Sequence, residues 1–149
     1  MNNYALEQAE ELFEQALEYF LGIEKEKNMI HAKELLQQSS ELGLSKSSNL
    51  LGDWYIKKII PGDNYKEAFK LYTRGYEFGD MRSFSRLAMC YEKGYGIKKD
   101  IPKALELYEK SVELGNKDAC FSIARIYEKG ENIKMDLSKA ILWYPQIRN

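Results

Sequence analysis

Few side chains in this 149-residue sequence could take part in chemistry: it has one histidine, His31, and two cysteines, Cys90 and Cys120. The cysteines fall on two equivalent predicted helices, 83–93 and 119–129, at positions that differ by about six residues along the helix. That is an axial offset of roughly 9 Å at the helical rise, which does not suit a disulfide. Two cysteines do not make a zinc site, and we expect both to be packing residues. We expect His31, early in a predicted helix, on the solvated surface.

Other catalytic patterns are not found. The sequence shows no pairing of a nucleophile with a base. We interpret Gly94-Tyr95-Gly96 as a turn between two helices rather than as a phosphate-binding loop. The many carboxylates are typical of solvated helix faces. We therefore predict that the protein is not an enzyme and has no catalytic, cofactor-binding or metal-binding residues, and no cofactor.

The elements that must position the remaining side chains recur every 36 residues. Tyrosines follow this step, at Tyr19, Tyr55, Tyr91 and Tyr127. Small residues follow it too, at Ala16, Gly52, Ala88 and Ala124. A period that holds across the chain indicates stacked repeats rather than one irregular core. The small residues mark where the first helix of each unit can approach its neighbour closely.

Each unit also carries start and stop signals for a second helix. Residues suited to the N-cap recur at Asn28, Asn64, Asp100 and Asp136. Glycines that can take the left-handed conformation at a helix end follow fifteen residues later, at Gly43, Gly79 and Gly115. At the end of the first helix of the second unit, Lys58 replaces the glycine that the other units have. Pro61-Gly62 predict a turn of a different type there.

These signals predict an all-α fold of about eight helices in four antiparallel pairs, forming a single repeat domain over residues 1–149. The predicted helices are 4–21, 28–42, 47–57, 65–78, 83–93, 101–114, 119–129 and 137–144. The repeat units are roughly 4–43, 47–79, 83–115 and 119–149. Pro145 should interrupt the last helix. Such a terminal unit is typical of a capping repeat, and the alternative is a docking surface for a second copy.

Composition restricts the class of partner. Lys and Arg nearly balance Asp and Glu, for a net charge of −1, so no general attraction to nucleic acid or anionic membrane is expected. No apolar run approaches the roughly 20 residues that span a bilayer. The N-terminal residues are acidic where a secretory signal would be basic and then apolar. We predict a cytoplasmic protein that binds neither nucleic acid nor membrane.

Three motifs give the chain a family resemblance. They are Leu51-Gly52-x-x-Tyr55, Tyr91-x-x-Gly94-x-Gly96-Ile97-x-x-Asp100-x-x-Lys103-Ala104, and Leu107-Tyr108-x-Lys110. In these the sequence resembles the Sel1-like repeat family, a longer-period relative of the tetratricopeptide repeats. The first unit departs from the pattern, with Gln15 where leucine is expected. The resemblance implies a right-handed α/α superhelical solenoid of about four 36-residue helix-turn-helix repeats. It also implies protein binding, mostly through the concave face lined by the first helices.

Helical geometry predicts which residues lie on the concave face. Positions flanking the small residue of each first helix point away from the packed side. The predicted partner-binding residues are Leu50, Asp53, Trp54, Arg86, Met89, Lys93, Arg125 and Lys129. Three residues of one register, Trp54, Cys90 and Ile126, are candidates for the core instead. The charged members are basic in the last two units. They predict an acidic patch on the partner, or else form a solvated gradient without function.

We therefore predict a non-catalytic protein–protein interaction module, an adaptor or scaffold that holds a protein partner in its concave groove. The alternative is a dedicated inhibitor, such as a cytosolic immunity protein that neutralises a cognate toxin. The identity of the partner is open. We expect a monomer or a weak dimer formed through the C-terminal repeat.

Overall fold

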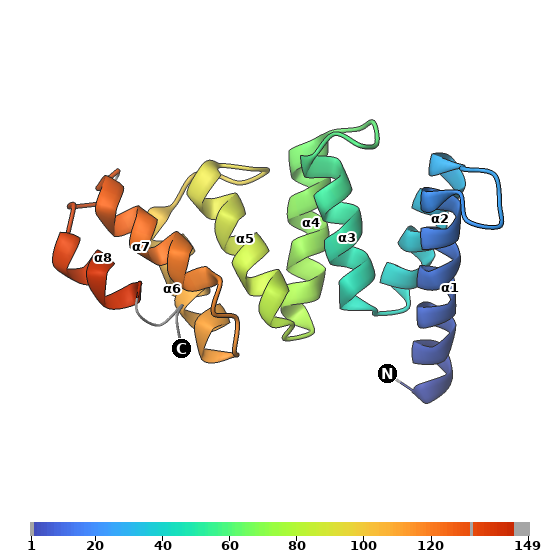
Figure 1. Cartoon of the computed structure of the whole chain (residues 1–149), viewed down its shortest axis with the longest axis horizontal. Coiled ribbons are helices and arrows are strands. Elements are labelled where there is room, and N and C mark those ends of the chain that lie inside the picture. Colours follow the sequence, from blue (N-terminus) through green and yellow to red (C-terminus); the bar gives the residue numbers. More distant parts are fainter. Residues whose placement is uncertain (1, 132, 145–149) are drawn as a thin grey trace. The chain divides into compact units, whose positions relative to one another are not determined.

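The computed structural model describes residues 2–131 and 133–144, and every regular element in this part of the chain is an α-helix. The helices, labelled in Figure 1, are α1 (Asn3–Leu21), α2 (Met29–Glu41), α3 (Ser45–Ile56), α4 (Asn64–Glu77), α5 (Met81–Lys93), α6 (Ile101–Glu113), α7 (Ala119–Lys129) and α8 (Leu137–Trp143). Each odd-numbered helix packs against the helix that follows it. The predicted all-α class and helix-turn-helix unit are confirmed. The predicted interruption at Pro145 lies outside the described residues.

The chain divides into two compact units, Met1–Phe78 and Gly79–Asn149. The first unit contains α1 to α4, and the second contains α5 to α8. Within each unit the second helix of one pair also packs against the first helix of the next pair, α2 against α3 and α6 against α7. Each unit therefore has a core of its own. That the four repeats form a single domain over residues 1–149 stays a prediction.

Small residues lie at the centre of both cores, as the repeat predicts. The members of the small-residue register are all buried, namely Ala16, Gly52, Ala88 and Ala124. Gly52 shows why size matters at this register. A Cβ on Gly52 would lie 2.5 Å from Cε1 of Tyr72, and a close-packed interior has no room for such an overlap. At this position α3 and α4 are therefore closer than alanine would allow.

Three of the four predicted N-caps are confirmed. The side chains of Asn28, Asp100 and Asp136 each accept a hydrogen bond from the backbone N–H three residues later. The prediction for Asn64 is wrong. The Pro61-Gly62 loop enters the helix one residue early, so Asp63 occupies the N-cap and makes no side-chain cap bond. The buried Oδ1 of Asn64 has no hydrogen-bond partner among the described residues.

The helix ends follow the predicted glycines, with positive φ at Gly43, Gly79 and Gly115. Lys58 adopts the left-handed conformation of the glycine that it replaces. Its φ is 57°, close to the 74° of Gly94, the residue at the same register. The C-cap of α3 is nevertheless Lys57, with a φ of −80°, whereas the other first helices have a left-handed glycine as C-cap. The loop that follows also differs at Ile60, which lacks the positive φ of Glu24 and Gly96 at the same register, and at Gly62, whose φ is 142°.

The capping geometry generates a first prediction. Replacing Asp100 with alanine should lower the free energy of unfolding by about 1 kcal/mol, because the cap bond to the Lys103 N–H is lost. Asp63→Ala is the matched control, since Asp63 makes no such bond and should cost little. Urea denaturation measures both. Equal midpoint shifts for the two variants would contradict the assignment of Asp100 as a stabilising N-cap.

Lys58 generates a second prediction. A left-handed conformation costs an L-residue roughly 1–2 kcal/mol, whereas the extra chain entropy of glycine costs roughly 0.5–1 kcal/mol. Lys58→Gly should therefore stabilise the protein by about 0.5–1 kcal/mol. Lys57 is equally exposed but has a φ of −80°, so Lys57→Gly should destabilise. Denaturant midpoints that move in the same direction for both variants would refute this account.

Candidate protein-interaction site

The predicted residues of the first unit lie on α3, and they are only partly available to a partner. Trp54 is 2% exposed, and its ring stacks on Phe20 with centroids 4.8 Å apart. Its side chain therefore belongs to the core, as do those of its register equivalents, Cys90 and Ile126. Asp53 is half-buried and accepts a hydrogen bond of 2.6 Å from the Tyr72 hydroxyl. Leu50 is half-buried as well.

The predicted residues of the second unit come together between α5 and α7. One hollow of about 200 Å³ is lined by residues that include Arg86, Met89 and Tyr108. A second hollow of about 230 Å³ is lined by residues that include Lys93, Lys129 and Glu92. We call these two hollows, with the residues that separate them, the α5–α7 groove. The structure therefore places four of the five predicted residues of this unit beside these two hollows.

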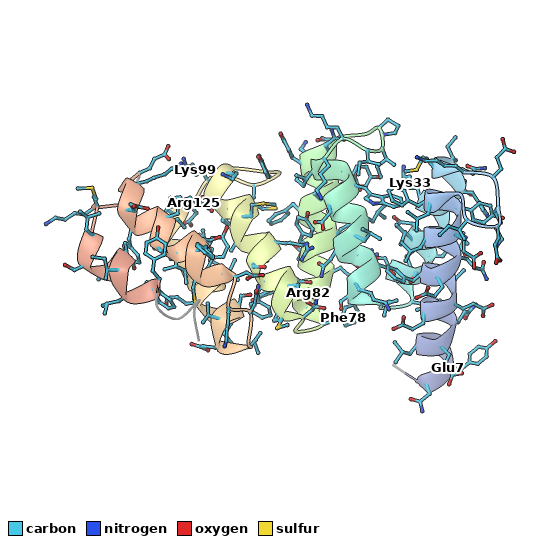
Figure 2. The ribbon with its side chains drawn as sticks, in the orientation of Figure 1. Glu7, Lys33, Phe78, Arg82, Lys99 and Arg125 are labelled. Carbon is cyan, nitrogen blue, oxygen red and sulfur yellow. The ribbon has the colours of Figure 1, made fainter. Side chains whose placement is uncertain are left out.

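The fifth residue, Arg125, takes part in a polar cluster between the two hollows. Its Nη2 donates hydrogen bonds of 2.8 Å to both carboxylate oxygens of Glu92, and Figure 2 labels Arg125 on α7. The Tyr108 hydroxyl donates a third bond of 2.8 Å to Glu92. Burial, reinforced by the negative charge of Glu92, raises the pKa of Tyr108, so its hydroxyl stays protonated and remains a donor.

This cluster changes the predicted role of Arg125. A guanidinium that binds both oxygens of a carboxylate has its charge largely compensated. Glu92 is the more buried partner, with a side chain 11% exposed, so the pair joins α5 to α7 inside the unit. Arg125 thus helps to build the groove, and the cations of Arg86, Lys93 and Lys129 line its two hollows.

Sequence reasoning missed Glu92, although the sequence carried a signal for it. Glu92 and Glu128 are 36 residues apart, as are Tyr108 and Tyr144. In the structure the Tyr144 hydroxyl donates to Glu128 at 2.9 Å, the same contact one repeat later. A search for pairs that recur together at the repeat period would have identified the tyrosine–glutamate contact.

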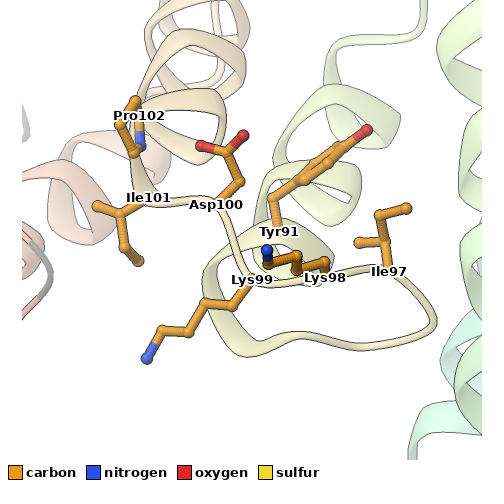
Figure 3. A pocket seen from close by; sticks show the side chains of 7 residues that line it. All are labelled: Tyr91, Ile97, Lys98, Lys99, Asp100, Ile101 and Pro102. Carbon is orange, nitrogen blue, oxygen red and sulfur yellow. The ribbon is translucent and has the colours of Figure 1, made fainter.

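Two further hollows lie beside the turns that join the helices of a pair. One of about 550 Å³ is shown in Figure 3 and is lined by Tyr91, Ile97, Lys98, Lys99, Asp100, Ile101 and Pro102. A hollow of about 560 Å³ recurs in the first repeat, lined at the same register by Tyr19, Lys25, Glu26, Lys27 and Asn28. The recurrence shows that this hollow follows from the turn geometry of the repeat. It therefore does not distinguish a functional site.

The side chains with reactive potential are held in structural contacts. Cys90 and Cys120 are free and buried, as expected of packing residues. Burial raises the pKa of the Cys90 thiol to about 12, so the reactive thiolate is scarce at neutral pH. The ring of His31 packs edge-on against Tyr19, with centroids 4.5 Å apart, and is only half-exposed.

Within residues 2–131 and 133–144, no group of three or more His, Cys, Asp or Glu side chains is arranged to hold a metal ion. No helix within them is long and apolar enough to cross a membrane.

Four helix pairs with a 36-residue period define the chain as an α/α helical-repeat protein. The model of the Sel1 repeat family matches residues 12–44, 47–80, 85–116 and 117–144. The chain therefore belongs to the Sel1 repeat family, as its motifs predicted. A search of curated proteins found no match.

Solved structures agree with this assignment. A Sel1 repeat protein from Oxalobacter formigenes matches 94% of this chain at 31% identity, with a TM-score of 0.84. A protective antigen of uropathogenic Escherichia coli strains with an SLR fold, c5321, matches 94% of it at 26% identity, with a TM-score of 0.81. The chain spans 58% and 30% of these two proteins. Cysteine rich protein B of Helicobacter pylori shares the fold over 78% of this chain and 87% of its own, at 24% identity and a TM-score of 0.62.

The polar cluster generates a third prediction. Arg125→Gln should lower the free energy of unfolding by about 1–2 kcal/mol, because it leaves the half-buried Glu92 carboxylate without its cation. Lys93→Gln removes a cation that is 3.9 Å from the same carboxylate and exposed. It should change stability by less than about 0.5 kcal/mol. Thermal or urea unfolding distinguishes the two, and an Arg125 variant as stable as the Lys93 variant would show that the pair is dispensable.

Proposed function

We propose that this protein is a non-catalytic interaction module that binds an acidic segment of a protein partner in the α5–α7 groove. Proteins built from Sel1 repeats generally serve as protein–protein interaction scaffolds rather than as enzymes. The observation that carries the finer proposal is the arrangement of side chains in the second unit. Predicted contact residues from two helices, α5 and α7, line the same groove.

The chemistry of the groove suits a partner that offers carboxylates beside an apolar group. The first hollow combines the Arg86 guanidinium with the adaptable side chain of Met89. The second has the ammonium groups of Lys93, Lys99 and Lys129 beside the carboxylates of Glu92 and Glu131, and Lys99 is paired with Glu131 at 3.3 Å. Guanidinium groups bind carboxylates with two parallel bonds, and ammonium groups attract them as point charges. A partner segment with acidic side chains at both ends of a short apolar stretch would match both hollows.

The distribution of charge favours the same partner. Residues 79–149 contain thirteen Lys and Arg against ten Asp and Glu, whereas residues 1–78 contain nine against thirteen. An acidic partner is therefore attracted to the second unit and repelled by the first, which raises the association rate and restricts the orientation of binding. Contacts at Leu50 and Asp53 of the first unit stay predictions. Trp54 is excluded as a contact because it is buried.

Two forms of this function differ in their binding behaviour. An adaptor, which we favour, should bind several partners with moderate affinity, whereas a dedicated inhibitor such as an immunity protein should form one nanomolar one-to-one complex with its toxin. A cytoplasmic location and the lack of nucleic-acid or membrane partners stay predictions. Affinity capture from the native host, with identification by mass spectrometry, distinguishes an adaptor from an inhibitor.

A fourth prediction concerns the groove cations. The double variant Arg86→Glu with Lys129→Glu should weaken capture of the native partner at least tenfold and reduce the salt dependence of association. Both side chains line the groove, and neither belongs to the Glu92 cluster. Surface plasmon resonance with the captured partner, at two ionic strengths, measures the effect.

The matched control for this test is Arg82→Glu with Lys134→Glu. It makes the same change in net charge within the same unit, at exposed positions that do not line the groove. Figure 2 labels Arg82 on α5. Equal losses for the two double variants would mean that the partner responds to net charge alone, which would refute binding in the groove. Reversal of Arg125 is left out, because it would break the ion pair with Glu92.

A further inference from the structure

The loop between α3 and α4, residues 57–63, has a hydrogen-bond pattern that differs from that of the other three turns between paired helices. In those turns the N–H of the N-cap residue donates to the carbonyl of the tyrosine nine residues earlier, at 2.8–3.0 Å. The three pairs are Asn28 with Tyr19, Asp100 with Tyr91 and Asp136 with Tyr127. In the second repeat the Tyr55 carbonyl accepts from Lys58 instead, at 3.1 Å. Among the described residues, the Asn64 N–H makes no bond of the regular kind.

The side chain of Ile60 explains this departure. In the regular turn the residue at its register has a left-handed backbone, as Glu24 and Gly96 show with φ values of 59° and 72°. A β-branched residue rarely adopts that conformation, because its side chain would crowd the backbone. Ile60 lacks a positive φ and is buried, with 3% of its surface exposed. The positive φ is found two residues later instead, at Gly62.

The observed loop leaves two polar defects at the start of α4. The buried Oδ1 of Asn64 has no hydrogen-bond partner among the described residues, and Asp63 occupies the N-cap without a side-chain cap bond. A regular turn would remove both defects, because Asn64 would then accept from the Glu67 N–H as Asp100 accepts from its own helix. An unpaired buried oxygen is costly. This cost offsets part of the stabilisation that the burial of Ile60 provides.

The loop also covers an aromatic ring. Tyr55 is 6% exposed, whereas the tyrosines at the same register in the other three repeats are half-buried. The covering segment includes Gly62, where an added Cβ would lie 3.0 Å from Cε1 of Tyr55. The same tyrosine borders a hollow of about 460 Å³, whose walls include Ile30 and Lys33. The position of Gly62 therefore controls the exposure of a ring beside this hollow.

We infer that the α3–α4 loop is a lid on Tyr55 with two states, the closed state of the structure and an open state with the regular turn of the other repeats. In the open state Ile60 leaves the core, Asn64 becomes the N-cap and the Tyr55 ring is as exposed as its equivalents. Burial of Ile60 favours the closed state, and capping by Asn64 favours the open one. A ligand that binds the exposed ring would shift the population towards the open state. The lid lies in the first unit and does not depend on the proposed groove.

Amide hydrogen exchange of two variants of the 149-residue chain tests the role of Ile60. Ile60→Gly and Ile60→Ala both remove the buried side chain, but only glycine adopts the left-handed conformation without a steric cost. The Asn64 amide should exchange at least tenfold more slowly in the glycine variant, because its N–H then donates to the Tyr55 carbonyl. The Asn28 amide of the same unit already has its bond and should exchange equally in both variants. Equal rates at Asn64 would overturn the assignment of Ile60.

Relaxation dispersion of the wild type tests the opening of the lid directly. Amides of residues 57–64 should show exchange on the microsecond-to-millisecond timescale of loop opening, whereas those of residues 93–100 in the regular turn of the third repeat should not. Asn64→Ala should reduce the exchange contribution, because alanine cannot cap α4 in the open state and the closed state loses its unpaired oxygen. A wild type without dispersion at residues 57–64, or an Asn64→Ala variant with unchanged dispersion, overturns the proposal.

Discussion

The close approach of the two helices in each repeat is the constraint on which the rest of the structure depends. Two helices can pack this closely only where a small side chain faces the neighbour, and Gly52 shows the limit, since a Cβ there would overlap the Tyr72 ring. The residue at that register is buried in all four repeats. Because the register is fixed at 36 residues, the positions on either side of it are fixed as well. The same spacing therefore determines which side chains reach the surface of α5 and α7.

Most of the fold could be predicted from the sequence because its signals are local. N-caps, left-handed glycines and small residues act within one helix or one turn, and they recur without insertions. The error at Asn64 is local too. At Asn64 the Pro61-Gly62 loop moved the helix start by one residue. At Lys58 the helix end imposed a left-handed conformation on a residue that rarely adopts it.

The candidate site was less predictable, because it depends on contacts between side chains of different helices. Arg86, Met89, Lys93 and Lys129, which helical geometry selected, line the two hollows, and their contact with a partner stays a prediction. It treated Arg125 as one more exposed cation, although Glu92 binds it with two hydrogen bonds. Helical periodicity predicts which side chains share a face of one helix. The hydrogen-bond partner of a side chain depends on which residues of the neighbouring helix lie opposite it. For Trp54 the sequence left both the surface and the core open, and the stacking of Phe20 from another helix places it in the core.

The Glu92 cluster connects the core of the second unit to the chemistry of its groove. The Tyr108 ring is buried between helices, while its hydroxyl fixes the carboxylate that holds Arg125. A partner carboxylate at the centre of the groove would have to compete with Glu92 for the Arg125 guanidinium. The free energy lost by breaking the internal pair would offset the free energy gained by the new contact. The internal pair therefore disfavours a partner carboxylate at the centre of the groove, beside Arg125.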